Sequence, residues 1–213
     1  MKFKEFLKLI SKIKNIPLQA EASHFKMMPP HRKEQLKNHD TDFRHAKQAG
    51  VLILFYPDER RQTKLILILR KTYKGVHSAQ VALPGGKLEN QDASLKETAL
   101  RETFEEVGVP VNHIRIVKEI SQIYISPSNF YVYPFIGITT VIPKFIKQDD
   151  EVEQLIEVDL DDFLDEKSIV KKYVKTFYSV DVEVPAFKLN KHIVWGATAM
   201  ILSEAKDLLK KVY

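Results

Sequence analysis

Runs of apolar residues after Gly50 predict a set of β-strands. They are rich in the branched and aromatic side chains that strands favour, and they cover residues 51–56, 65–69, 80–83, 114–123 and 130–141. Residues 57–60, which begin Pro-Asp, favour a turn, so the first two strands are expected to form a hairpin. Residues 154–160 predict a further strand.

Two longer stretches carry the pattern of helices. Residues 93–107 form the one strongly helical stretch among the strands, and residues 195–212 predict a closing helix. A short helix is expected at 161–164, whereas residues 174–184 alternate poorly. Strands with one long helix among them and another at the end predict an α+β fold, in which helices cover both faces of a mixed sheet.

The N-terminal residues predict an amphipathic helix that ends before Pro17. The apolar positions at helical spacing are Phe3, Phe6, Leu7, Ile10 and Ile13, with lysines at many of the others. We expect this helix to pack on the domain or on a second subunit rather than on a membrane surface. Residues 20–49 predict an extended arm followed by a short helix. The expected division is therefore 1–45 for helix and arm and 46–213 for one folded domain.

Composition narrows the classes of protein. A chain of 213 residues with 44% hydrophobic and 29% charged residues fits one globular domain with short additions. Its apolar runs are shorter than the ~20 residues that a membrane span needs, and no signal peptide is recognised at the start. Cysteine is absent, which excludes disulfides, thiolate nucleophiles and Cys-type zinc sites and predicts a reducing cytoplasm.

The net charge of +5 favours an anionic partner. The charge is spread over many lysines, so it fits an anionic small molecule as well as nucleic acid, and we expect no nucleic acid partner. Stable membrane association is not expected either, and a homodimer is left open.

Residues 84–109 combine a strand end, a glycine loop, a helix and a stop. Asp92 or Ser94 can cap the helix, and Ser94 with Glu97 fits a capping box. Gly108 occupies the left-handed position that ends many helices. On a helical wheel the apolar face is expected to carry Leu100, Phe104 and Val107.

Three glutamates are expected to share the opposite, exposed face of this helix. Glu102, Glu105 and Glu106 are related by three or four positions, and like charges at that spacing destabilise a helix by about 0.2–0.5 kcal/mol per pair. A solvated acidic face would explain an isolated Glu-Glu pair. Here a Gly-Gly loop and an Arg-Glu pair accompany it, which favours a Mg²⁺ or Mn²⁺ site to which the backbone of Gly86 adds a carbonyl. Arg101 is expected to pair with Glu105 and to hold its orientation.

This stretch resembles the signature of the Nudix hydrolases: Gly, five residues, Glu, seven residues, Arg-Glu, an aliphatic residue, any residue, Glu-Glu, any residue, Gly and an aliphatic residue. The parts that fit are Arg101-Glu102, Glu105-Glu106 and Gly108-Val109. Gly86 and Arg101 are 15 positions apart where the signature has 14, the first acid is Asp92, and Thr103 replaces the aliphatic residue. The resemblance implies a Nudix-type α/β/α sandwich.

The lengthened loop and three further segments resemble the coenzyme A pyrophosphatase branch of that family. The segments are residues 67–86, in which Ala79 replaces a usual Gly, residues 126–137 and residues 195–199. This resemblance implies hydrolysis of the diphosphate of coenzyme A or a derivative to phosphopantetheine and adenosine 3′,5′-bisphosphate. The alternatives are another nucleoside diphosphate derivative, such as ADP-ribose or a dinucleotide, and a Nudix-fold binding module without turnover.

The resemblance suggests roles for further residues. A metal held by Glu102, Glu105 and Glu106 would neutralise the diphosphate and activate water. The expected contacts to further phosphates come from Arg70, Lys71, Lys74 and His77, although exposed loop charges are the alternative. The general base is expected to be a helix glutamate or an acid of the loop after Pro143, with Glu151 ahead of Asp150 and Glu153. Phe130, Tyr131 and Tyr133 could stack on adenine, although core packing is favoured.

Overall fold

The computed structural model describes residues 1–30, 32, 45–72, 79–174 and 182–213. Among these residues, one large sheet has the strand order β3-β2-β1-β7-β5, with β4 beside β1, β6 beside β7 and β8 beside β2. Its strands are β1 (Lys47–Pro57), β2 (Thr63–Arg70), β3 (Val81–Ala82), β4 (Gly85–Lys87), β5 (Ile114–Glu119), β6 (Ile123–Ile125), β7 (Phe130–Thr139) and β8 (Val152–Asp159). The pairing of β1 with β7 is parallel and the others are antiparallel, so the sheet is mixed as predicted.

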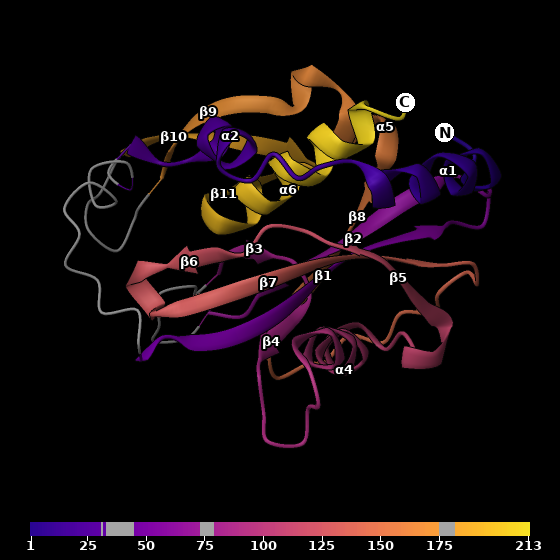
Figure 1. The fold of residues 1–213 in the computed structure, drawn as a ribbon, viewed down its shortest axis with the longest axis horizontal. Helices are drawn as coiled ribbons and strands as arrows, with labels where there is room; N and C mark the ends of the chain where they lie inside the picture. The colour runs from indigo at the N-terminus through magenta and orange to yellow at the C-terminus, as the bar shows by residue number, and fades with distance from the viewer. Residues whose placement is uncertain (31, 33–44, 73–78, 175–181) are drawn as a thin grey trace.

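Helices lie on both sides of this sheet (Figure 1). Helix α4 (Leu95–Val107) covers one face, and α6 (Gly196–Lys210) lies on the other side with the N-terminal helices. A three-stranded sheet in the order β11-β10-β9 lies on the side of α6. The remaining elements are α1 (Phe3–Ile10), α2 (Glu21–His24), α5 (Leu160–Leu164), β9 (Ile169–Val174), β10 (Val182–Leu189), β11 (His192–Trp195) and the short 3₁₀ turns η1 (Ser11–Asn15), η2 (Phe25–Met27), η4 (Val111–His113), η5 (Ser126–Ser128) and η6 (Glu166–Ser168).

Strand β1 supplies both hydrophobic cores because it is buried on both faces. Ile53 and Phe55 belong to the core on the α6 side, and Leu52 and Leu54 belong to the core under α4. Successive side chains of a strand point to opposite faces, so a continuous apolar run serves two layers. This arrangement confirms the α+β sandwich that the alternation of elements predicted.

Most predicted elements are present, with three differences. The predicted glycine loop is in part a strand, because Gly85–Lys87 form β4 and pair with β1. The run 114–123 is not one strand, because β5 ends at Glu119 and β6 begins only at Ile123. The small sheet was not predicted: residues 174–184 alternate poorly, and β10 begins only at Val182. Its strands find their partners through antiparallel pairing of β10 with β9 and β11, which no single run of residues reveals.

The N-terminal helix packs on the domain through its apolar face, as expected. Phe3, Phe6 and Ile10 are buried, and the ring of Phe6 lies 5.0 Å from that of Phe55. In the stretch 20–49 the short helix comes first, at α2, and much of the expected arm lies outside the described residues. In the described parts of the chain no helix is long and apolar enough to cross a membrane. The division of the chain at residue 45 stays a prediction.

Candidate active site

Helix α4 is capped at both ends by the predicted residues. The Ser94 side chain accepts a hydrogen bond from the Glu97 backbone N–H at 3.3 Å, and the Glu97 carboxylate accepts one from Ala93 at 3.0 Å. These contacts satisfy amide groups that the first turn of a helix leaves unpaired. Gly108 ends the helix with φ of 77°, and its N–H donates to the Phe104 carbonyl at 2.8 Å. The caps therefore fix where the acidic stretch begins and ends.

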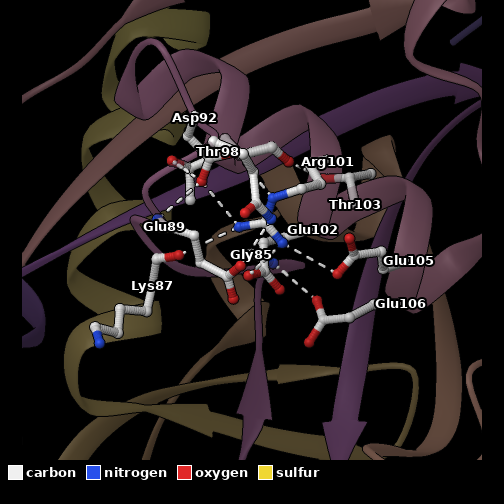
Figure 2. Close-up of polar contacts among 12 residues, drawn as sticks. Gly85, Lys87, Glu89, Asp92, Thr98, Arg101, Glu102, Thr103, Glu105 and Glu106 are labelled. Carbon is white, nitrogen blue, oxygen red and sulfur yellow. Dashed lines mark hydrogen bonds and ion pairs between the residues drawn. The ribbon is translucent and has the colours of Figure 1, made fainter.

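Arg101 links most of the acidic side chains of the site (Figure 2). Its guanidinium donates two hydrogen bonds of 2.9 Å to Asp92, one of 3.1 Å to Glu105, and lies 3.0 Å from Glu102. The predicted pair with Glu105 is confirmed. Hydrogen bonds to Asp92 come first among the causes that raise the pKa of Arg101, and those from Arg101 lower the pKa of Asp92.

Asp92 is the structural partner of Arg101, a role that the residue pattern did not predict; the pattern offered Asp92 only as an alternative to Ser94 for the helix cap. Its side chain is 3% exposed, and besides Arg101 it accepts hydrogen bonds of 3.0 Å from the Glu89 N–H and the Thr98 hydroxyl. These contacts join the glycine loop to the first turns of α4. A signal was present, because Asp92 follows Gly86 by the six positions at which the signature places its first Glu.

The carboxylate of Glu102 lies directly on the backbone of Gly86. A Cβ atom built on Gly86 would come within 2.3 Å of the Glu102 carboxyl carbon, so a larger residue would displace that carboxylate. Burial raises the pKa of Glu102, Arg101 opposes the rise, and the negative charges of Glu105 and Glu151 add to it. The Gly86 backbone, whose carbonyl is a predicted metal ligand, and the Glu102 carboxylate are thus brought together.

Glu106 is buried, contrary to the expectation of an exposed acidic face. Its residue exposure is 2%, and its carboxylate accepts a hydrogen bond of 2.8 Å from the Gly85 N–H. Burial raises the pKa of Glu106 to about 8; the Gly85 N–H and Arg70 oppose the rise, and the charges of Glu102 and Glu151 add to it. The ionised form of a buried carboxyl costs free energy unless a positive charge lies beside it. A bound cation would supply that charge for Glu106.

The predicted apolar face of α4 was also wrong in one position. Phe104 is 50% exposed, whereas Thr103 is completely buried. The buried stripe runs through Ala99, Thr103 and Val107, and the Thr103 hydroxyl donates to the Ala99 carbonyl at 2.6 Å. The helical-wheel prediction placed only apolar side chains on the buried face. A threonine can also lie there when its hydroxyl donates a hydrogen bond to a carbonyl of the same helix.

Two of the four predicted phosphate contacts can be placed. Arg70 ends β2, and its guanidinium lies 3.8 Å from the Glu106 carboxylate. Lys71 follows it, and its backbone N–H donates to the Glu151 carbonyl at 2.9 Å. Lys74 and His77 lie outside the described residues. The structure therefore brings Arg70 to the acids, and a role in binding substrate stays a proposal.

Glu151 is the loop acid that lies within electrostatic reach of the helix acids. Its negative charge raises the pKa of both Glu102 and Glu106. Glu151 is exposed to solvent. The candidate base, the buried acid and Arg70 therefore converge from a loop, a helix and a strand.

The donor set fits a hard divalent cation. Carboxylates and backbone carbonyls are the oxygen ligands such ions prefer, and the cluster at Glu102, Glu105 and Glu106 carries negative charge that Arg101 and Arg70 only partly offset. Within the described residues no three acidic or histidine side chains already surround one metal position. Arg101 and Gly85 hold the carboxylates individually, so coordination would require side-chain rotations.

The three aromatic residues of β7 that could stack on adenine, Phe130, Tyr131 and Tyr133, are half-buried and contact nearby side chains. Tyr131 lies with its ring 5.1 Å from that of Tyr124, and the Tyr133 hydroxyl accepts a hydrogen bond of 3.3 Å from Gln48. The Lys47 ammonium lies 5.8 Å from the ring centre of Phe130. These contacts are structural, and stacking on adenine stays a prediction.

Comparison with known proteins agrees with the geometry. The profile of the NUDIX domain matches residues 46–177, more than half of the chain. A protein of Pectobacterium atrosepticum named "Uncharacterized Nudix hydrolase NudL" is 31% identical over 166 residues, which cover 74% of this chain and 80% of that protein.

Solved structures show the same fold at low sequence identity. A Nudix hydrolase from M. smegmatis, RenU, superposes with a TM-score of 0.53 at 13% identity and covers 79% of this chain and 88% of its own. A MutT/nudix family protein from Enterococcus faecalis gives a TM-score of 0.51 at 15% identity, with 92% of this chain and 76% of its own covered. These structures support the arrangement of sheet and helices.

Proposed function

We propose, because this chain belongs to the Nudix family of hydrolases, that it hydrolyses the diphosphate of coenzyme A or one of its derivatives. Family membership establishes the coarser activity, hydrolysis of a diphosphate bond in a nucleoside diphosphate derivative. The finer assignment to coenzyme A is supported by the loop that is one residue longer than the Nudix signature and by the three segments that resemble the coenzyme A pyrophosphatase branch.

One backbone feature of the first segment, residues 67–86, supports this assignment. Ala79 has φ of 54°, a left-handed conformation that glycine adopts without strain. The branch has its usual glycine at this position. The backbone at Ala79 therefore has a conformation that suits glycine, although the residue differs.

The single observation that carries the proposal is the meeting of acids and arginine at one place. Glu102, Glu106 and Arg70 lie together beside the glycine loop, so groups for a cation and for a phosphate occur side by side. Arginine binds phosphate oxygens through paired donors, and carboxylates do not. This mixture suits a substrate whose negative charge is shared between a metal ion and a guanidinium.

A divalent cation would be held by Glu102, Glu105, Glu106 and the Gly86 carbonyl, with Mg²⁺ or Mn²⁺ the proposed ions. Such a cation supplies charge neutralisation of the diphosphate and lowers the pKa of water. Arg101 would orient Glu102 and Glu105, which it already contacts, and Asp92 would hold Arg101.

The proposed chemistry adds one water molecule across the diphosphate. Glu151 accepts a proton from the attacking water, whose oxygen forms a new bond to one phosphorus. The bond from that phosphorus to the bridging oxygen breaks, and the bridging oxygen leaves on the other phosphate. Arg70 offsets the negative charge that develops on the phosphates. The products are phosphopantetheine and adenosine 3′,5′-bisphosphate.

Product identification tests this proposal. The full chain is incubated with Mg²⁺ and either coenzyme A, dephospho-coenzyme A or ADP-ribose. The products are then separated and identified by mass spectrometry. The proposal expects phosphopantetheine from coenzyme A at a higher kcat/KM than AMP-forming cleavage of ADP-ribose. A preference for ADP-ribose would overturn the coenzyme A assignment and leave the family reaction in place.

A further inference from the structure

The segment that follows β7 is attached to the last turn of α4. The Ile146 N–H donates to the Val107 carbonyl at 3.0 Å, and the Gln148 N–H donates to the Glu106 carbonyl at 3.2 Å. The last carbonyls of a helix have no partner within it, and here this segment supplies partners. Gln148 is therefore bonded to the backbone of Glu106, the buried acid of the site.

The same segment is tied to the end of β2 on its other side. The Lys71 N–H donates to the Glu151 carbonyl at 2.9 Å, directly after Arg70. The segment that carries Glu151 is thereby hydrogen-bonded both to the end of the strand that contains Arg70 and to the helix that carries Glu106. Both attachments use backbone atoms, so neither depends on the identity of the Glu151 side chain.

The Gln148 side chain completes the connection. Its Oε1 atom accepts a hydrogen bond of 2.7 Å from the Glu151 N–H, and its carbonyl accepts one of 3.0 Å from the Val152 N–H. One residue thus joins the backbone of Glu106, through its own N–H, to the backbone of Glu151, through its side chain. Gln148 is half-buried, whereas Glu151 is exposed and open to water.

We infer that Gln148 is a positioning residue that sets the place of the Glu151 carboxylate relative to Glu106. This inference rests on the proposed function, in which Glu151 accepts the proton of the attacking water. A misplacement of about 1 Å at a reacting group can lower a rate by about 100-fold. Loss of the Gln148 side chain frees the turn that carries Glu151 while both attachments through backbone atoms remain.

The first measurement compares steady-state kinetics of three variants of the full chain with its preferred substrate. Gln148→Ala should lower kcat by about 10- to 100-fold with KM changed by less than about threefold. Gln148→Glu keeps an oxygen acceptor at the same reach and should recover most of kcat. Gln154→Ala, on the exposed part of β8, is the matched control and should retain the kcat of the unmodified chain. A Gln148→Ala variant as active as Gln154→Ala would overturn the inference.

The second measurement asks whether Gln148 acts through Glu151. Glu151→Gln should lower kcat strongly, and adding Gln148→Ala to it should change kcat by less than about twofold, because the positioned group is already lost. The positioning role of Gln148 would be overturned if the two substitutions lowered kcat by independent factors that multiply in the double variant. A Glu151→Gln variant with full activity would overturn it as well. Glu106→Gln separates the two proposals: if it keeps full turnover the proposed function fails, and if it abolishes turnover while Gln148→Ala leaves kcat unchanged, only the positioning role of Gln148 fails.

Discussion

The Arg101 guanidinium donates two hydrogen bonds of 2.9 Å to the Asp92 carboxylate, although nine positions separate the two residues in the chain. Asp92 lies on the side of the Arg101 guanidinium away from Glu105 (Figure 2). One guanidinium therefore contacts both the loop that carries Asp92 and the acidic residues of the helix. A planar group with donors on several edges suits this position, and a lysine would not replace it. The orientation of the acids is therefore coupled to the stability of the loop.

Replacing Asp92 with Asn should lower the free energy of unfolding at pH 7 by about 2 kcal/mol, because hydrogen bonds to charged groups contribute about 1.5–3 kcal/mol. Chemical denaturation of both proteins measures the difference. Asp162→Asn, at an exposed position of α5, is the matched control and should change stability by less than about 0.5 kcal/mol.

The Asp92 substitution should also change the response to acid. Arg101 holds the pKa of Asp92 well below its usual range. Stability from a carboxyl with a lowered folded pKa is present above its unfolded pKa of about 3.9 and is lost as the pH falls toward the folded pKa. Between about pH 5 and pH 3 the unmodified protein should lose more unfolding free energy than the Asn variant. Equal losses would show that Asp92 is not ionised against Arg101.

Replacing Glu106 with Gln should reduce turnover by at least about 100-fold while the fold is kept. Burial raises the pKa of Glu106 to about 8, so without metal this carboxyl is mostly protonated in the folded protein at pH 7 but ionised in the unfolded chain, and the proton uptake lowers the free energy of unfolding. The Gln variant should therefore be at least as stable as the unmodified protein in thermal unfolding without metal.

Added Mg²⁺ or Mn²⁺ extends this test. An ion at a hundredfold excess over its Kd stabilises the folded state by about 2.7 kcal/mol, and the Tm should rise for the unmodified protein but not for Glu106→Gln. Glu153→Gln, on the exposed edge of β8, is the matched control and should respond to metal like the unmodified protein. A metal response that survives in Glu106→Gln would refute this ligand.

Replacing Arg70 with Ala should affect coenzyme A more than dephospho-coenzyme A. We propose that Arg70 also contacts the 3′-phosphate of coenzyme A, in addition to offsetting charge at the diphosphate. Dephospho-coenzyme A has no 3′-phosphate, so with that substrate only the contact at the diphosphate is lost. The ratio of their kcat/KM values should fall by about tenfold, which corresponds to ~1.4 kcal/mol. Arg60→Ala, in the exposed turn between β1 and β2, should leave the ratio unchanged. An unchanged ratio in Arg70→Ala would remove the 3′-phosphate contact.

Replacing Ala79 with Gly should raise the free energy of unfolding by about 0.5–1 kcal/mol. The left-handed backbone disfavours Ala by about 1–2 kcal/mol, and the greater freedom of Gly in the unfolded chain cancels part of the gain. Ala93→Gly is the matched control: Ala93 is exposed and is not among the residues with positive φ, so Gly should lower stability there. Denaturant unfolding of both variants decides the sign.

Local patterns predicted a large part of this architecture correctly. The apolar run 51–56 predicted a strand, now part of β1, and Ser94 and Gly108 marked the ends of α4 to within a residue. Such features depend on neighbours within a few positions, because caps, turns and amphipathic spacing are short-range. The pairing of Arg101 with Glu105 belongs to the same class, since it spans one helical turn.

The small sheet and the surroundings of the acids could not be predicted in this way. Glu106 was expected on an exposed face that binds metal, but it is buried, and the Gly85 N–H donates a hydrogen bond to its carboxylate. The strands of the small sheet lack a clear alternation and are held by their partners. When the burial or pairing of a residue depends on segments far away in the chain, the neighbouring residues of the sequence give little indication of it.

Residue order alone specified the kinds of group in the site: three glutamates one helical turn apart, an arginine beside them and a glycine loop ahead. Folding then sorted these groups by burial and by partner. It enclosed Glu106, exposed Phe104, set Asp92 against Arg101 and brought Glu151 toward the helix through Gln148. Spacing along a helix is set by covalent geometry, whereas burial and long-range partners are set by how separate elements pack.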